Sequence, residues 1–192
     1  MLLTDRKKEI IDAAIRLIAA KGIQELTMKK IAVEIGVSEP ALYRHFSGKS
    51  EIIRTLIEQF DRNVSIGNAG ACGFAPVKDF VLSRMEQVLE NPALAKVMFT
   101  EEFFINDPVF SEQLMLMMHR HKAFIGSCIA KGINSGALRS DIAPEMVFRL
   151  IIGPVRLLIK QWGMSGMRFD LRSKMIELLD TLELLLVKEN EK

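Results

Sequence analysis

Apolar residues recur at helical spacing along nearly the whole chain, and no segment shows the alternation of polar and apolar residues typical of a half-buried strand. Between Thr4 and Gly22 this spacing predicts a first helix, because a threonine is a good N-cap and a glycine is a common C-terminal stop. Its apolar positions are Ile10, Ile11, Ala14, Leu17 and Ile18. The pattern as a whole therefore predicts an all-α fold.

Two short helices follow the first one. The segment "LTMKKIAVEIG" predicts a helix that is capped by Thr27 and ends at Gly36. A third helix is expected from Ser38, as its N-cap, to about Phe46, with Pro40 in the first turn, where a missing N–H costs little. Two short helices joined by a turn of three or four residues that contains glycine predict a helix-turn-helix.

The third helix carries much of its chemistry on one face. If Leu42 and Phe46 point into the core, the outer face is polar and aromatic. An exposed helix of this kind can enter the major groove of DNA, where arginine can bind guanine and small residues can touch the thymine methyl group. The alternative is an ordinary helical hairpin with a solvated polar face. The outer residues are Ser38, Glu39, Ala41, Tyr43, Arg44 and His45.

The string "TMKKIAVEIGVSEPALYRHFSGKSEII" resembles the DNA-binding domain of the TetR (tetracycline repressor) family of transcriptional regulators. This resemblance covers about the first quarter of the chain. Glu39 departs from a cationic expectation: it could accept from cytosine, stabilise the helix N-terminus or repel a nearby phosphate, and the helix-end role ranks first. The resemblance implies that Pro40 shapes the helix start and touches a thymine methyl group. It implies phosphate or backbone contacts by Thr27, Tyr43, His45 and Lys49, and base-edge contacts by Ser38, Glu39, Ala41 and Arg44.

The remainder of the chain predicts a helical bundle. A fourth helix follows the motif, the glycine-rich segment 66–76 predicts a loop, and further Pro and Gly clusters divide the rest into about five helices. We expect about nine helices in two domains. These are a DNA-binding helix-turn-helix domain over residues 1–50 and a domain over residues 51–192. The resemblance implies that the second domain binds an effector and forms a dimer.

The second domain is rich in methionine and phenylalanine. Most of these residues are expected in the core, but methionine clusters also suit an adaptable cavity for apolar ligands. The family resemblance implies a small-molecule pocket here. Its ligand could be oriented by Arg84, Glu101 and Glu102, but these residues are expected on an exposed face. His119 and His121 are two residues apart and cannot chelate one metal from a helix, so no metal site or cofactor is expected. The candidate ligand residues are Met98, Phe99, Phe103, Met115, Met118, His119, Phe124 and Phe148.

Two late helices, "PEMVFRLIIGPVRLLIKQW" and "LRSKMIELLDTLELLLV", carry more apolar surface than one chain needs to cover. Paired across a twofold axis they would form a four-helix interface, the arrangement that the resemblance implies. The alternative is that they bury against the rest of their own chain. The candidate interface residues are Arg149, Arg156, Lys160, Met175, Leu178, Leu179, Leu182 and Leu186.

Charge and composition narrow the function. The net charge is only +2, but residues 1–54 hold ten basic and seven acidic residues, so the basic excess lies at the N-terminus. The two cysteines have no metal or disulfide spacing and the N-terminus has no apolar leader, so we expect a cytoplasmic protein. The sequence shows no converging catalytic groups, so we do not expect an enzyme. The expected function is that of a TetR-like regulator, a repressor by family tendency. It binds a palindromic operator as a homodimer and is released by a small, largely apolar effector. The alternative is a DNA-binding adaptor or nucleoid-associated protein that acts through a protein partner.

Overall fold

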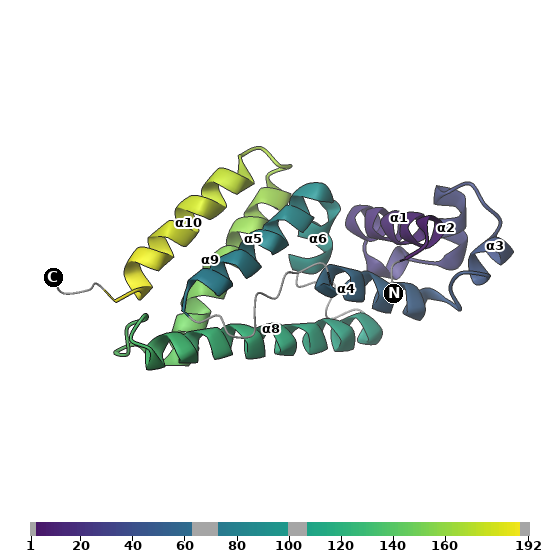
Figure 1. Ribbon diagram of the computed structural model, residues 1–192. Helices are drawn as coiled ribbons and strands as arrows, with labels where there is room; N and C mark the ends of the chain where they lie inside the picture. The colour runs from purple at the N-terminus through teal and green to yellow at the C-terminus, as the bar shows by residue number, and fades with distance from the viewer. Residues whose placement is uncertain (1–2, 63–72, 100–106, 189–192) are drawn as a thin grey trace. The chain divides into compact units, whose positions relative to one another are not determined.

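The computed structural model describes residues 3–62, 73–99 and 107–188, and these residues form nine α-helices and one short 3₁₀ helix (Figure 1). The predicted all-α fold is confirmed. One isolated antiparallel bridge joins Leu138 and Val187. The helices are α1 (Asp5–Lys21), α2 (Met28–Glu34), α3 (Glu39–Tyr43), α4 (Lys49–Arg62), α5 (Ala75–Glu90), α6 (Ala93–Phe99), α8 (Pro108–Asn134), α9 (Pro144–Met164) and α10 (Leu171–Leu186), with the 3₁₀ helix η1 (Ile23–Glu25).

The predicted N-caps of the first two helices are confirmed, and so is the end of α1 at Gly22, whereas α2 ends at Glu34, two residues before the predicted Gly36. Thr4 Oγ1 accepts a hydrogen bond from Lys7 N at the start of α1, and Gly22 follows its last residue with φ of 86°. Thr27 Oγ1 accepts from Lys30 N, at 3.2 Å, at the start of α2. Both caps satisfy backbone N–H groups that the helix itself leaves unpaired.

The start of α3 differs from the sequence prediction, because Ser38 occupies the N-cap position but its side chain makes no capping hydrogen bond. Pro40 supplies no N–H at the second helical position, and Ala41 N donates to the Ser38 carbonyl oxygen at 3.0 Å. Neither amide that a capping hydroxyl normally binds is therefore left for Ser38. The regular helix also ends at Tyr43, three residues before the predicted end.

The chain divides into two compact units. The first comprises Met1–Arg62 and Ala93–Met117, and the second comprises Asn63–Pro92 and Met118–Lys192. The long helix α8 contributes to both. The predicted domain boundary after residue 50 stays a prediction, while α4 and α6 group with the N-terminal helices in the first unit.

The first unit is built around α1, which packs against α2, α4 and α6. Its core side chains Ile10, Ile18, Ile31 and Leu42 are at most 1% exposed. These residues hold α2 and α3 in place through apolar burial. The α2–α3 hairpin is therefore presented on a packed support.

In the second unit, α10 packs against both α9 and α5 (Figure 1). Met175 and Leu179 of α10 are completely buried in this bundle. Lys78 Nζ of α5 donates to Asp180 Oδ1 and Glu183 Oε2 of α10, and these two hydrogen bonds raise the pKa of Lys78. In the described part of the chain, no helix is long and apolar enough to cross a membrane.

Candidate functional site

The outward face of α3 is the candidate nucleic-acid interface. Leu42 and Phe46 are each 1% exposed and anchor the helix, as expected, while Tyr43 next to them is 52% exposed. This division leaves the other candidate residues at or near the surface. Ser38, Pro40 and Arg44 are exposed, and Glu39, Ala41 and His45 are half-buried.

Thr27 is exposed at the start of α2, where its oxygen already accepts from Lys30 N. Its hydroxyl hydrogen remains able to donate to a phosphate oxygen, since a hydroxyl both accepts and donates. Both roles therefore fit one side chain, as the family resemblance implies.

Lys49 has partners within the first unit that sequence reasoning missed. Its Nζ donates to the carbonyl oxygen of Ile23 at 3.1 Å and lies 2.9 Å from Asp107 Oδ2. The side chains of Lys49 and Asp107 are 29% and 13% exposed. In the sequence, Asp107 stands out only as part of a helix-breaking "NDP", and nothing there connects it with Lys49.

The segment that carries Lys49 is held by Glu51. Glu51 Oε2 accepts from the backbone N–H of Ser47 at 2.6 Å and from its hydroxyl at 2.8 Å. Both hydrogen bonds lower the pKa of the Glu51 carboxyl, and the bond from the Ser47 backbone has the larger effect. The turn between α3 and α4 therefore has a defined conformation that fixes the position of the Lys49 backbone.

The candidate ligand residues divide between the two units. Met98 and Phe99 of α6 are buried in the first unit, Met115 is exposed there, and Phe103, like Glu101 and Glu102, lies outside the described residues. The second unit contains the other four. Of these, Met118, Phe124 and Phe148 are half-buried and His119 is exposed.

A buried polar cluster in the second unit was not predicted. Arg84 was expected on an exposed face, but it is 5% exposed, and Gln87 one turn later is 8% exposed. Arg84 Nη1 donates to Gln87 Oε1 at 3.2 Å, and Arg84 Nη2 lies 2.6 Å from His121 Nε2. The expectation for Arg84 failed because its partner His121 lies 37 residues away in the sequence. The signal that could have found it is its helical spacing with the apolar residues Phe80, Val81 and Val88.

The candidate interface residues of α9 and α10 also divide. Met175, Leu179, Leu182 and Leu186 are buried within their own chain, so they offer little surface to a partner. Leu178, Arg156 and Lys160 are half-buried, and Arg149 is exposed with an ion pair to Glu145. The large apolar side chains that α9 and α10 do expose are Met146, Leu150, Leu157, Met164, Ile176, Leu184 and Leu185.

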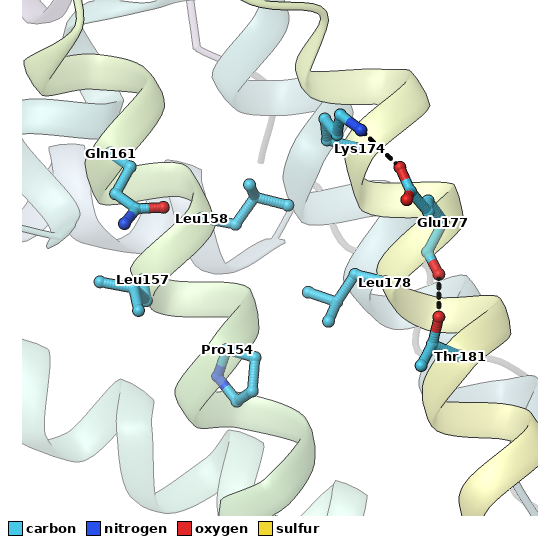
Figure 2. Close-up of a pocket in the computed structure, with 8 residues that line it drawn as sticks. All are labelled: Pro154, Leu157, Leu158, Gln161, Lys174, Glu177, Leu178 and Thr181. Carbon is cyan, nitrogen blue, oxygen red and sulfur yellow. Dashed lines mark hydrogen bonds and ion pairs between the residues drawn. The ribbon is translucent and has the colours of Figure 1, made fainter.

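A groove of about 350 Å³ runs between α9 and α10. Leu158 and Leu178 point toward each other across it (Figure 2). On α10, Lys174 Nζ donates to Glu177 Oε2 at 2.7 Å, and the Thr181 hydroxyl donates to the Glu177 carbonyl oxygen at 2.8 Å. The lining residues are Pro154, Leu157, Leu158, Gln161, Lys174, Glu177, Leu178 and Thr181.

Two family models match this chain. Residues 10–56 match the model described as bacterial regulatory proteins, tetR family, and residues 53–188 match the YsiA-like protein, C-terminal region. Among individual proteins, the nucleoid occlusion factor SlmA of Photobacterium profundum is 40% identical over 63 residues. That match spans 32% of each protein, so the chain matches about a third of this relative's length.

Solved structures with similar folds match nearly the whole chain. The ketosteroid transcriptional regulator KstR2 of Mycobacterium tuberculosis aligns with a TM-score of 0.79 and 20% identity, over 98% of each chain. The transcriptional regulator FadR of Bacillus subtilis, solved with stearoyl-CoA, aligns with a TM-score of 0.72 and 21% identity, over 91% of this chain and 96% of that one. Together with the family models, this identifies the chain as a member of the TetR family of DNA-binding transcriptional regulators, a family of regulators and not of enzymes.

Proposed function

We propose that the chain forms a homodimer that represses transcription by binding a palindromic operator. A small, largely apolar effector releases it. The observation that carries this proposal is the exposed face of α3, on which Tyr43 is 52% exposed beside the fully buried Leu42.

Direct contacts with DNA are assigned by chemistry. Arg44 is exposed and can donate two parallel hydrogen bonds to guanine, while Ala41 and Pro40 offer apolar contact to a thymine methyl group. Contacts to the DNA backbone, which set the position of the protein but do not read the sequence, are made by Thr27, Tyr43, His45 and Lys49. Ser38 and Glu39 lie at the start of α3, and the proposed docking would bring them to the base edges.

Dimerisation is supported by the exposed apolar surface of α9 and α10. Leu157 is 54% exposed, Leu185 is 55% exposed and Leu184 is 75% exposed. Exposed apolar surface that gathers into a patch commonly marks an interface between chains. A second copy would cover it and would bring two α3 helices to two half-sites of one operator.

The effector is proposed to bind in the C-terminal part of the chain. The FadR structure of Bacillus subtilis, a protein with the same fold, holds stearoyl-CoA, a molecule with a long apolar chain. Met118, Phe124 and Phe148 are half-buried candidates for such a ligand. Release requires the effector to prefer the state that does not bind DNA, since equal affinity for both states shifts nothing.

The test is selection of bound duplexes from a random DNA pool by the purified protein, at two salt concentrations. A twofold-symmetric consensus would support a dimeric sequence-specific regulator. Binding without a consensus that disappears as salt rises would contradict it, because phosphate contacts alone carry no sequence information. An Arg44→Ala variant is the matched control, because it keeps the fold and removes one base-reading side chain.

The second candidate is a DNA-binding adaptor that acts through a protein partner. The local similarity to a nucleoid occlusion factor favours it, but that similarity covers only 63 residues. Measuring operator binding with and without a small molecule distinguishes the two functions. A regulator released by an effector loses its operator when a cognate small molecule is added, whereas an adaptor keeps it.

A further inference from the structure

The cluster of the buried Arg84 and Gln87 with the half-buried His121 has a chemistry that the apolar effector proposed above does not use. Arg84 and Gln87 are the two buried polar side chains among the described residues. They lie one turn apart on α5, and His121 faces Arg84 from α8. All three belong to the second unit, so their geometry is internal to one packed body.

The hydrogen bonds of Arg84 fix the orientation of both neighbours. A guanidinium group donates and never accepts. Gln87 must therefore turn its oxygen toward Arg84 Nη1, which it meets at 3.2 Å. His121 Nε2 likewise takes the acceptor role toward Arg84 Nη2, which lies 2.6 Å away.

This orientation leaves a buried donor. Gln87 Nε2 makes no hydrogen bond with any residue that the structure describes, although its side chain is more than nine-tenths buried. A buried donor without an acceptor is unfavourable, and native proteins rarely retain one without a bound partner or a functional reason. The missing group is an acceptor, and the adjacent guanidinium favours one that is negatively charged.

Aromatic rings surround the polar atoms. The Arg84 guanidinium lies 5.4 Å from the centre of the Phe80 ring, and Phe80 contacts Phe124 with ring centres 5.6 Å apart. The His121 ring meets Phe80 edge-on, with centres 5.0 Å apart. The rings of Phe80 and Phe124 are therefore the apolar groups that would pack against the body of a ligand whose acceptor reaches Gln87.

We propose that the Arg84–Gln87–His121 cluster binds the carboxylate group of an amphipathic organic acid, whose apolar part packs against Phe80 and Phe124. A carboxylate is acceptor-only when ionised, so it matches the Gln87 N–H group and the charge of Arg84. This inference rests on the effector role proposed above and names the chemical class of the effector.

Calorimetric titration of the full chain with decanoate and with decan-1-ol, below their aggregation concentrations, tests the proposal. The two probes share a chain length and differ in the charged acceptor. We expect decanoate to bind at least about tenfold more tightly, as a charge-assisted hydrogen bond predicts. Equal affinity for the two probes, or no binding of decanoate, would overturn the proposal.

Variants locate the site. Gln87→Met removes the donor at similar volume, and Arg84→Met removes the charge, so both should reduce the preference for decanoate. Gln87→Glu places a carboxylate beside Arg84 inside the protein, so it should abolish decanoate binding while the helical circular dichroism is retained. Wild-type affinity in all three variants would overturn the assignment.

The matched control is Arg172→Met. Arg172 is an exposed arginine of α10 whose Nη2 donates to Glu86 Oε2 on α5 at 2.6 Å. It should keep wild-type decanoate binding, which excludes a general effect of lowering the positive charge. If Arg84→Met fails to fold, Gln87→Met and Gln87→Glu decide the outcome.

A second readout separates this inference from the proposed function. Operator release is measured with the same probes by fluorescence anisotropy. Decanoate that binds at Gln87 without releasing operator supports the site and contradicts the effector role. Release by a compound without a carboxylate, with no decanoate binding, overturns the site and leaves the proposed function intact.

Discussion

Asp107 uses both carboxylate oxygens, and one of them lies 2.9 Å from Lys49 Nζ. The other, Oδ1, accepts from the backbone N–H groups of Val109 and Phe110 at the start of α8, each at 3.1 Å. One side chain therefore caps α8 and neutralises the lysine that the family resemblance places on a DNA phosphate. A phosphate must compete with Asp107 for Lys49.

Asp107→Asn should strengthen operator binding several-fold. The asparagine oxygen can still cap α8, but the negative charge that holds Lys49 is gone. The slope of log affinity against log salt should steepen by about 0.9 for each Lys49 that gains a phosphate, and so by about 1.8 for the proposed dimer. Fluorescence anisotropy with the selected operator at several salt concentrations measures both quantities.

Asp141→Asn is the control for this change. Asp141 is an exposed carboxylate whose pKa is lowered to about 2 by its hydrogen bonds with Arg139. Its removal should leave operator affinity unchanged. If Asp107→Asn also leaves it unchanged, Lys49 is a structural residue and not a phosphate contact.

Tyr43→Phe and Arg44→Ala should weaken DNA binding in different ways. The tyrosine hydroxyl is expected to contact the DNA backbone, so its loss should weaken binding to all DNA sequences alike, by a few-fold. Arg44 is expected on a base edge, so its loss should cost about 1–3 kcal/mol at one operator position. Competition binding against single-base operator variants separates the two. A uniform loss in both variants removes Arg44 from the base-reading set.

Leu157→Lys should shift the chain from dimer toward monomer. Leu157 is 54% exposed on α9 and lines the groove between α9 and α10. A lysine ammonium placed in an apolar interface between two copies would lose its hydration. Sedimentation equilibrium reports the change, with Leu116→Lys as control, since Leu116 is 46% exposed on α8. An unaltered dimer in the Leu157 variant would place the interface elsewhere.

Gly132→Ala should destabilise the second unit by about 1–3 kcal/mol, the usual cost of overpacking. A Cβ at Gly132 would lie 2.7 Å from Gly73 Cα and 2.8 Å from Leu138 Cδ1. Gly126→Ala is the matched change in the same helix, because its added Cβ would meet no described atom within 4 Å beyond the neighbouring residues and backbone of its own helix. Alanine there should stabilise by up to about 1 kcal/mol through helix propensity. Urea denaturation compares the two, and equal effects would contradict the close approach at Gly132.

The sequence was sufficient for the helices and for the helix-turn-helix. Threonine caps, glycine stops and apolar spacing act within one or two helical turns, so α1 and α2 were predicted with the correct caps. The exposure of Tyr43 beside Leu42 follows from the same local rule. The Ser38 side chain makes no capping hydrogen bond because Pro40 has no N–H group and Ala41 N donates to the Ser38 carbonyl oxygen instead.

The tertiary structure decided which buried face meets which partner. Hydrophobic periodicity identifies a buried face but not the chain that covers it, so Met175 and Leu179 were assigned to a dimer although their own unit buries them. The pairs Lys49–Asp107 and Arg84–His121 join residues far apart in the sequence. Only the folded chain brings such side chains within hydrogen-bond distance, because a hydrogen bond depends on position in space and not on spacing along the sequence.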